Sequence, residues 1–254
     1  MDTIIEARDL RREYTTYKGA MRKKKEIVEA VRGISFTVAR GEIFGLLGQN
    51  GAGKTTTIKM LTTLLAPTSG TCKVFGYDSF GQEKQIRRHI NFIFGGEMGV
   101  YRRLSGRDNL RYFANLYLLD TATRERRISE ILELVELTDA ADRLAETYSK
   151  GMIQRLQIAR GLINDPEILF MDEPTVGLDP LGARMLRNII RKLRDEGKTV
   201  LLTTHYLPEA EELCDRMVIL DHGEIVARGT PAEIKGDADT LEDAYVALMK
   251  GAAV

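Results

Sequence analysis

The sequence predicts an α/β fold with a mainly parallel central sheet and an inserted helical segment. Three observations carry this prediction. Short apolar strands alternate with helical patterns along much of the chain, which is typical of parallel sheets. A glycine-rich loop joins one of these strands to a helix, and a helical stretch near residues 104–147 interrupts the alternation. The 254 residues, 43% of them hydrophobic, are enough to bury a sizeable core, so we expect one domain over residues 1–254.

The first part of the core is expected to be a strand, a loop and a helix. Residues 34–38 alternate as a strand, and residues 43–47 form a second strand that is apolar at most positions. After the loop, residues 55–65 are expected to be helical because apolar residues recur there at helical spacing, with Pro67 and Gly70 beyond the end. This order of strand, loop and helix is what a phosphate-binding site needs.

Helical patterns fill the middle of the chain, and further strands follow. Apolar stripes run from Leu110 to Tyr117 and from Ile128 to Val135, which indicates a helical subdomain inserted into the core. The core then resumes with three apolar strands, at residues 168–171, 199–202 and 217–220, and with a helix at residues 181–196. A last helix is expected over residues 241–250.

Composition excludes several classes of protein. Lys plus Arg and Asp plus Glu both number 37, so no global charge draws the chain toward nucleic acid or a membrane surface. Cys72 and Cys214 have no His or Cys partner at ligand spacing, which argues against a disulfide framework and a zinc site. No apolar run approaches the roughly 18 residues of a membrane span. We therefore expect a protein of the reducing cytoplasm that is not itself embedded in a membrane.

Residues 48–55 read Gly-Gln-Asn-Gly-Ala-Gly-Lys-Thr, which matches the phosphate-binding loop known as Walker A. Its glycines let backbone amides converge on phosphates, and the following helix adds its positive N-terminal end. We predict that Lys54 reaches the β- and γ-phosphates and that the Thr55 hydroxyl binds Mg²⁺. Such a string can arise by chance in a turn, but the flanking strand and helix favour a nucleotide site. The predicted contacts in this loop are Gly48, Asn50, Gly51, Gly53, Lys54, Thr55 and Thr56.

Adjacent carboxylates, Asp172 and Glu173, end the strand at residues 168–171. Neighbouring side chains on a strand point in different directions, so the two groups can do different jobs. We predict that Asp172 holds Mg²⁺ through water and that Glu173 polarises the water that attacks the nucleotide. Taken alone, paired acids at a strand end are more often a helix-capping turn. The phosphate-binding loop in the same chain favours the catalytic interpretation.

Residues 148–155, Tyr-Ser-Lys-Gly-Met-Ile-Gln-Arg, lie just upstream of that strand and resemble the signature motif of ABC ATPases. Residues 175–179 resemble the loop through which the subunits of this family meet, and His205 resembles the family's switch histidine. A histidine after a strand is more often a structural residue, but its place among the other motifs favours a catalytic role. The likeness to ABC transporter ATP-binding subunits covers residues 3–230.

This resemblance implies a RecA-like core, which carries the phosphate-binding loop, and an N-terminal antiparallel β subdomain. The core would comprise residues 1–90 and 160–230, the helical subdomain residues 91–159, and a tail residues 231–254. ATP and Mg²⁺ are the implied cofactors.

The resemblance also implies a dimer in which each ATP is enclosed by two subunits. Ser149 and the Gly151 amide would contact the γ-phosphate held by the second subunit, and Asp179 would lie at the dimer contact. Tyr14 stands where the family keeps an aromatic residue that stacks on adenine. Tyr17 is close by, and an exposed tyrosine without such a role is the alternative at this position.

The chain departs from the family pattern at three places. Gly96 stands where the family usually has a glutamine that touches Mg²⁺. Either water completes the metal shell, or Glu97 reaches in, or the coupling between hydrolysis and transport is loosened; our hypothesis is a site completed by water. Lys150 and Met152 replace two glycines of the usual signature motif, but Gly151 keeps the amide that matters. A basic cluster lies at residues 18–25 and is either a solvated hairpin loop or a patch for lipid or a partner.

The resemblance implies a motor that drives a separate, integral membrane permease from the cytoplasmic face of the membrane. The sequence has one ATPase domain and no span, so the permease would be another polypeptide, and the second ATPase subunit would be either identical or different. The run at residues 172–180 and the tail at residues 241–244 look like those of export motors for drugs, lipids, polysaccharides or sodium. Selectivity belongs to the permease, so the transported substrate leaves no mark on this chain.

Two other classes of function remain as alternatives. A soluble ABC ATPase would act on nucleic acid, ribosomes or a protein assembly, but such proteins typically carry tandem ATPase domains or long insertions that this sequence lacks. No nucleic-acid partner is therefore expected. A nucleotide-gated clamp without turnover would fit the glycine at position 96. Against it, Lys54, Asp172, Glu173 and His205 are all present.

Overall fold

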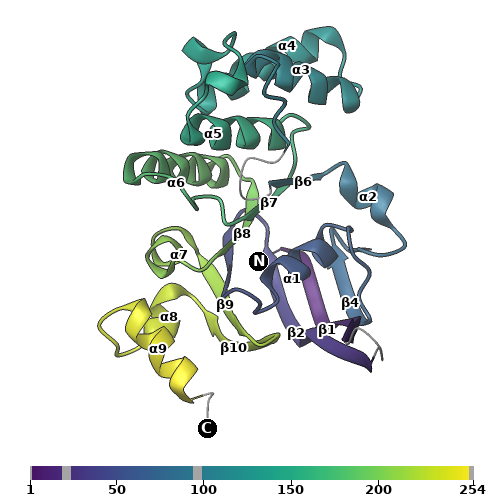
Figure 1. Ribbon diagram of the computed structural model, residues 1–254, viewed down its shortest axis with the longest axis vertical. Coiled ribbons are helices and arrows are strands. Elements are labelled where there is room, and N and C mark those ends of the chain that lie inside the picture. The colour runs from purple at the N-terminus through teal and green to yellow at the C-terminus, as the bar shows by residue number, and fades with distance from the viewer. Residues whose placement is uncertain (1, 19–23, 94–98, 252–254) are drawn as a thin grey trace. The chain divides into compact units, whose positions relative to one another are not determined.

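The computed structural model describes residues 2–18, 24–93 and 99–251, with residues 17, 18, 24, 25 and 251 described by their backbone alone (Figure 1). The chain divides into two compact units. The first unit is Met1–Arg87 together with Leu201–Val254, and the second is Arg88–Val200. Strand β8 (Thr199–Thr204) contains the point at which the chain passes from one unit to the other.

An antiparallel sheet forms much of the first unit, with strand order β2-β1-β4-β5. Its strands are β1 (Thr3–Lys18), β2 (Lys24–Ala39), β4 (Ser69–Val74) and β5 (Tyr77–Asp78). The first two form a long hairpin whose pairing runs from Thr3 and Ala39 to Lys18 and Lys24, with bulges where the register shifts. The strand expected at residues 34–38 is therefore the end of a much longer one.

A second group of strands in the first unit supports the glycine-rich loop. Strand β3 (Ile43–Leu47) is buried at all five positions and pairs in parallel with β9 (Arg216–Asp221), which turns back into β10 (Glu224–Gly229). The helices described in this unit are α1 (Lys54–Leu61), α2 (Glu83–Arg87), α7 (Leu207–Leu213), α8 (Pro231–Lys235) and α9 (Leu241–Gly251). The loop thus leaves a strand that is buried along its whole length.

The described part of the second unit holds the parallel pair β6 (Ile90–Ile93) and β7 (Ile168–Asp172) and four longer helices. These are α3 (Gly106–Leu116), α4 (Thr121–Leu134), α5 (Lys150–Gly161) and α6 (Pro180–Asp195), with short 3-10 turns at residues 138–140 and 145–147. Parallel pairs, an antiparallel sheet and intervening helices agree with the predicted α/β class. None of the described helices has the length and apolar character that crossing a membrane requires.

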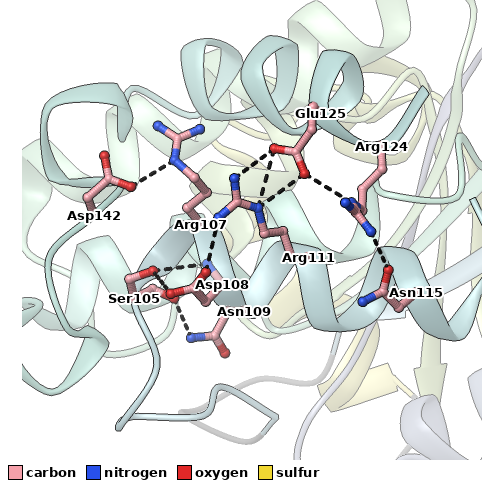
Figure 2. A network of polar contacts seen from close by, with 9 residues as sticks. All are labelled: Ser105, Arg107, Asp108, Asn109, Arg111, Asn115, Arg124, Glu125 and Asp142. Atoms are coloured by element: carbon pink, nitrogen blue, oxygen red, sulfur yellow. Dashed lines mark hydrogen bonds and ion pairs between the residues drawn. The ribbon is translucent and has the colours of Figure 1, made fainter. Parts of the chain in front are cut away.

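An ionic network joins α3 to α4 (Figure 2). The Arg111 guanidinium donates to the Glu125 carboxylate at 2.9 Å and also contacts Asp108. Arg124 donates to the other oxygen of Glu125 at 3.0 Å. Beneath this layer, apolar side chains of both helices are buried, among them Leu110, Ala114, Ile128, Ile131 and Leu132. The apolar stripes seen in the sequence therefore form the contact between these two helices.

Two helix ends differ from the sequence expectation for local reasons. Helix α1 ends at Leu61 rather than near residue 65, because the Thr62 hydroxyl bonds the Ile58 carbonyl at 2.8 Å and Thr63 adopts a left-handed φ of 65°. The stretch at residues 104–147 is broken after α3 by Leu118, whose φ is 57°. Neither break is signalled by glycine or proline.

Candidate nucleotide-binding site

The glycines of the phosphate-binding loop are required by close backbone contacts. A Cβ added at Gly48 would lie 2.3 Å from the carbonyl oxygen of Leu220, and one added at Gly53 would lie 2.5 Å from that of Ala30. Both glycines also have positive φ, as does Gly51. A Cβ at Gly51, by contrast, would meet nothing within 4 Å. The loop is therefore pressed against the protein at its two ends and is open at its middle.

Hydrogen bonds fasten the same loop to the turn between β9 and β10. The Ala52 amide donates to the Gln49 carbonyl at 3.1 Å, which closes a tight turn inside the loop. The Ala52 carbonyl in turn accepts from the Gly223 amide at 3.2 Å, and the Gly223 carbonyl accepts from the Arg32 amide at 2.8 Å. The conformation of the loop is thus held by β2 and by the β9–β10 turn.

Lys54 folds back over the loop that precedes it. Its side chain is only 5% exposed, and its Nζ donates to the carbonyl oxygens of Gly48 at 2.6 Å and Gln49 at 3.2 Å. Because these carbonyls belong to the loop, the ammonium group is placed at the loop and beside the first turn of α1. A positive charge there adds to the positive end of the helix.

The N-terminus of α1 is arranged to accept an anion. Gly53, its N-cap residue, supplies no capping side chain, and the first turn holds no acidic residue. Thr57 is buried and its hydroxyl bonds the Gly53 carbonyl at 2.9 Å, whereas Thr55 is exposed and Thr56 is half-buried. Side chains cap the four longer helices described in the second unit, by contrast, through Ser105, Asp120, Ser149 and Asp179.

His205 lies on the same face of the first unit as the loop. It follows β8 and precedes α7, and with five other residues it lines a pocket of about 250 Å³. The other lining residues are Gly48, Gln49, Asn50, Leu207 and Tyr245. The structure therefore brings the predicted switch histidine together with the start of the phosphate-binding loop. Tyr245 was not among the residues predicted from the sequence, because a tyrosine in a C-terminal helix belongs to no motif.

Tyr14 lies on β1 with one face of its ring covered. The Arg12 guanidinium stands over the ring at 4.9 Å from its centroid and donates to the Ala66 carbonyl at 2.9 Å. The side chain of Tyr17, the alternative adenine contact, lies outside the described residues. So do Gly96, Glu97 and the side chains of the basic cluster at residues 18–25.

The paired acids end β7 in the second unit. Asp172 is the last residue of the strand, and Glu173 adopts a left-handed backbone conformation with a φ of 50°. Such a conformation costs a residue with a side chain about 1 kcal/mol. This conformation follows directly on the last residue of the strand. Both side chains are half-buried.

The segment after Glu173 turns into α6. The Asp179 carboxylate caps that helix by accepting from the Gly182 amide at 2.8 Å. Val176 and Leu181, on either side of Asp179, are 54% and 69% exposed. Asp179 therefore has a structural role within its own chain, and the apolar side chains beside it are presented to solvent.

The residues of the signature motif begin α5. Tyr148 is buried and its hydroxyl donates to the Ala140 carbonyl at 2.6 Å, while the Ser149 side chain caps the helix by accepting from the Met152 amide at 3.3 Å. A Cβ added at Gly151 would meet nothing closer than the Ser149 Oγ at 3.9 Å. Nothing inside the described chain therefore requires glycine at this position, and the space above the α5 terminus is open.

A metal ion bound at this site would take part of its ligands from phosphates and water and not all of them from protein side chains. Across residues 2–18, 24–93 and 99–251, no group of three His, Cys, Asp or Glu side chains is placed to hold one. A hydroxyl such as that of Thr55 and a carboxylate such as that of Asp172 suit Mg²⁺, which usually takes few protein ligands together with phosphates and water. The donor set thus fits a metal that arrives with a nucleotide.

The loop and the α1 terminus define a phosphate-loop nucleotide-binding protein, and the segment before α5 narrows that class. The family profile described as ABC transporter matches residues 31–176. The chain belongs to the ABC transporter family, as one of its ATP-binding subunits.

Curated relatives cover most of this chain. It is 41% identical to the ABC transporter ATP-binding protein NatA of Bacillus subtilis, over 89% of this chain and 92% of that protein. It is 45% identical to the daunorubicin/doxorubicin resistance ATP-binding protein DrrA of Streptomyces peucetius, over 81% of this chain and 62% of that protein. A fluoroquinolones export ATP-binding protein of Mycobacterium tuberculosis is 46% identical, over 84% of this chain and 69% of that protein.

Solved structures agree with these relatives. An ATP-binding subunit of an ABC transporter superposes with a TM-score of 0.78 at 32% identity, covering 97% of this chain and 99% of that one. A dimeric ATP-binding cassette in a post-hydrolysis state, bound to ADP and Pi, gives a TM-score of 0.76 at 25% identity, with 89% and 98% covered. The predicted fold class and the predicted ABC ATPase activity are confirmed. The alternative of a soluble ABC ATPase that acts on nucleic acid finds no support.

Proposed function

We propose that this chain is the motor subunit of an ABC exporter, which dimerises around Mg²⁺ and ATP and drives a separate membrane permease. The observation that carries the proposal is the phosphate-binding loop, held by backbone contacts at Gly48 and Gly53 and open at Gly51. Export is supported by the names of two relatives, a fluoroquinolones export protein and a daunorubicin/doxorubicin resistance protein. Those names describe the relatives, and the substrate here is set by the permease.

The loop and the start of α1 would hold the nucleotide phosphates. Lys54 would exchange its bonds to loop carbonyls for bonds to the β- and γ-phosphates. The amides at the start of α1, from Gly53 to Thr56, would point at the same oxygens, whereas the Ala52 amide stays bonded to the Gln49 carbonyl. Thr55 and Asp172 would hold Mg²⁺, which supplies charge neutralisation at the phosphates. The Tyr14 ring would stack on adenine through the face opposite the Arg12 guanidinium.

Two side chains would then act in hydrolysis. Glu173 would accept a hydrogen bond from the water that attacks the γ-phosphate and so orient it. His205 would contact the γ-phosphate, because it lines the same pocket as Gly48 and Asn50. The left-handed conformation at Glu173 supports this role, because strained backbone often fixes the direction of a functional side chain.

A second ATPase subunit, identical or different, would complete each site. Ser149 and the Gly151 amide would meet the γ-phosphate held by the other subunit, in the open space above α5. Asp179, with the exposed Val176 and Leu181 beside it, would lie at the subunit contact. The dimeric cassette among the solved structures supports such an assembly.

The permease would dock on the second unit, which would place the chain at the cytoplasmic face of the membrane. Large apolar side chains are exposed just before α3, along it and directly after it, namely Tyr101, Tyr112, Leu116, Tyr117 and Leu118. Leu118 is 89% exposed, and exposed apolar side chains of this kind suit a contact with another protein. We also propose that the chain is one ABC ATPase domain in which residues 91–159 form the helical subdomain.

The test is ATP hydrolysis with and without Mg²⁺, combined with size exclusion in ATP. Wild type should hydrolyse ATP only with Mg²⁺, and Glu173→Gln should lose turnover and elute as a stable dimer with ATP. Glu196→Gln changes an exposed carboxylate of the same unit and should behave as wild type. A Glu173→Gln protein that still turns over at the wild-type rate would remove the proposed base. A chain that binds no ATP at all would remove the proposed function.

A further inference from the structure

The C-terminal helix reaches the phosphate-binding loop. Tyr245, on α9, lines the pocket that also holds Gly48, Gln49 and His205. The hydroxyl of Tyr245 is hydrogen-bonded to the side chain of Gln49. A residue near the C-terminus is thereby joined to the second residue of the loop.

Tyr245 is carried on a helix that is packed against the rest of the first unit. Leu241 and Ala244, one turn apart on α9, are buried, and the helix packs against both α7 and α8. Thr240 fixes its start by accepting from the Asp243 amide at 3.1 Å. The tyrosine ring is therefore presented to the loop by a packed helix and not by a loose tail.

Gln49 is the residue through which this contact acts on the nucleotide loop. Its carbonyl oxygen accepts from the Ala52 amide at 3.1 Å and from the Lys54 Nζ at 3.2 Å. Its side chain meets Tyr245 on the other side. Any movement of Gln49 therefore disturbs both the turn inside the loop and the anchoring of the lysine.

The hydroxyl of Tyr245 stays neutral at physiological pH. Burial raises its pKa, the hydrogen bond with Gln49 opposes that rise, and the charge of Asp221 adds to it. The contact is therefore an ordinary hydrogen bond between neutral groups throughout the range in which the protein would work.

We propose that Tyr245 is a positioning residue for the nucleotide site, through which α9 holds Gln49 and sets the affinity of the phosphate-binding loop for ATP. This inference rests on the proposed nucleotide site. It gives the tail after the core a defined role, because whatever shifts α9, such as a partner that binds it, changes nucleotide affinity through one hydrogen bond. The effect falls on binding and not on the chemical step, since Tyr245 acts on the loop that holds the phosphates.

The test is equilibrium binding of a fluorescent ATP analogue to the full chain. Tyr245→Phe and Gln49→Leu should each raise Kd about two- to tenfold, the range that one ordinary hydrogen bond supplies. The double variant should bind the ATP analogue with the same affinity as the single variant that binds it less tightly, because both changes remove the same hydrogen bond. In steady-state hydrolysis Tyr245→Phe should raise KM while kcat changes by less than about twofold. Tyr77→Phe removes an exposed hydroxyl of the same unit and should match wild type.

The results that would contradict this inference can be told apart from a failure of the nucleotide site itself. A wild-type chain that binds no ATP analogue removes the nucleotide site itself and the inference with it. Normal binding by wild type with an unchanged Kd in Tyr245→Phe overturns the inference alone, as does a double variant whose effects add. A fall in kcat at constant KM would also overturn it. Thermal unfolding of the nucleotide-free variants should coincide with wild type, which separates positioning from a general loss of structure.

Discussion

The ammonium nitrogen of Lys54 lies 2.6 Å from the carbonyl oxygen of Gly48, so the lysine is bonded to the loop whose ligand it is proposed to bind. The same carbonyl group belongs to a residue that admits no side chain. The charge of Lys54 is thus placed by the loop itself.

Replacing this lysine should therefore remove nucleotide binding with little damage to the fold. We expect Lys54→Met to weaken ATP binding by about tenfold or more, since hydrogen bonds to a charged group are the stronger kind. Titration with a fluorescent ATP analogue measures the loss. Lys59→Met, an exposed lysine on the same helix, is the matched control. Equal losses in the two variants would show that the charge of α1 as a whole matters and not the placement of Lys54.

Two glycines of the loop should differ sharply in how they tolerate alanine. Gly53→Ala brings a Cβ to 2.5 Å from the Ala30 carbonyl oxygen and should cost about 2–4 kcal/mol of unfolding free energy. Gly51→Ala meets no neighbour and should cost only about 1 kcal/mol, for the left-handed backbone. Urea denaturation of both variants measures the difference. Similar losses would mean that the contact with Ala30 relaxes readily.

Gly151→Ala should weaken the ATP-dependent dimer without lowering the stability of the fold. Its new Cβ would have no neighbour closer than 3.9 Å, and alanine favours a helix over glycine by about 1 kcal/mol, so thermal stability should hold or rise. In a Glu173→Gln background the same change should weaken the ATP-dependent dimer seen by size exclusion. Gly106→Ala, whose Cβ would lie 2.3 Å from the Tyr148 hydroxyl, should instead lose stability. Intact dimerisation in Gly151→Ala would contradict the proposed contact across subunits.

The network on α3 and α4 predicts a loss of stability in acid. Hydrogen bonding to Arg111, with Arg124 adding to it, lowers the pKa of Glu125 from 4.5 to about 2. A lowered carboxyl pKa stabilises the folded state above the unfolded pKa, and that contribution is lost as pH falls from about 4.5 through about 2. Because both partners are exposed, the contribution should be below about 1 kcal/mol. Urea denaturation at pH 7 and pH 3 should show wild type losing more than Glu125→Gln.

The sequence predicts those parts of the structure that depend on residues close to one another along the chain. The phosphate-binding loop could be predicted because a buried strand, glycines at fixed spacing and a helix follow one another directly, and the structure places Gly48 and Gly53 against backbone for the same reason. The stripes of α3 and α4 were visible because one face of each helix is buried. The long hairpin of β1 and β2 was seen only at its end, since exposed polar residues line both strands.

Contacts between distant parts of the chain could not be predicted in the same way. The sequence predicted a helix over residues 241–250, but the face that it turns toward Gln49 depends on how α9 packs against α7 and α8. The left-handed backbone at Glu173 also leaves no trace in the sequence, because glutamate rarely adopts it and the strand end imposes it here.

The cap that Ser149 provides on α5 affects how the proposed ATP-dependent dimer would form and separate. The Ser149 Oγ accepts a hydrogen bond from the Met152 amide, and its own proton remains available to donate. A hydroxyl can accept one hydrogen bond and donate another at the same time. Ser149 could therefore bind a phosphate while the first turn of α5 stays folded. Amide hydrogen exchange in that turn should therefore be the same in the separated and the joined subunits, and the cycle can repeat without partial unfolding at its contact point.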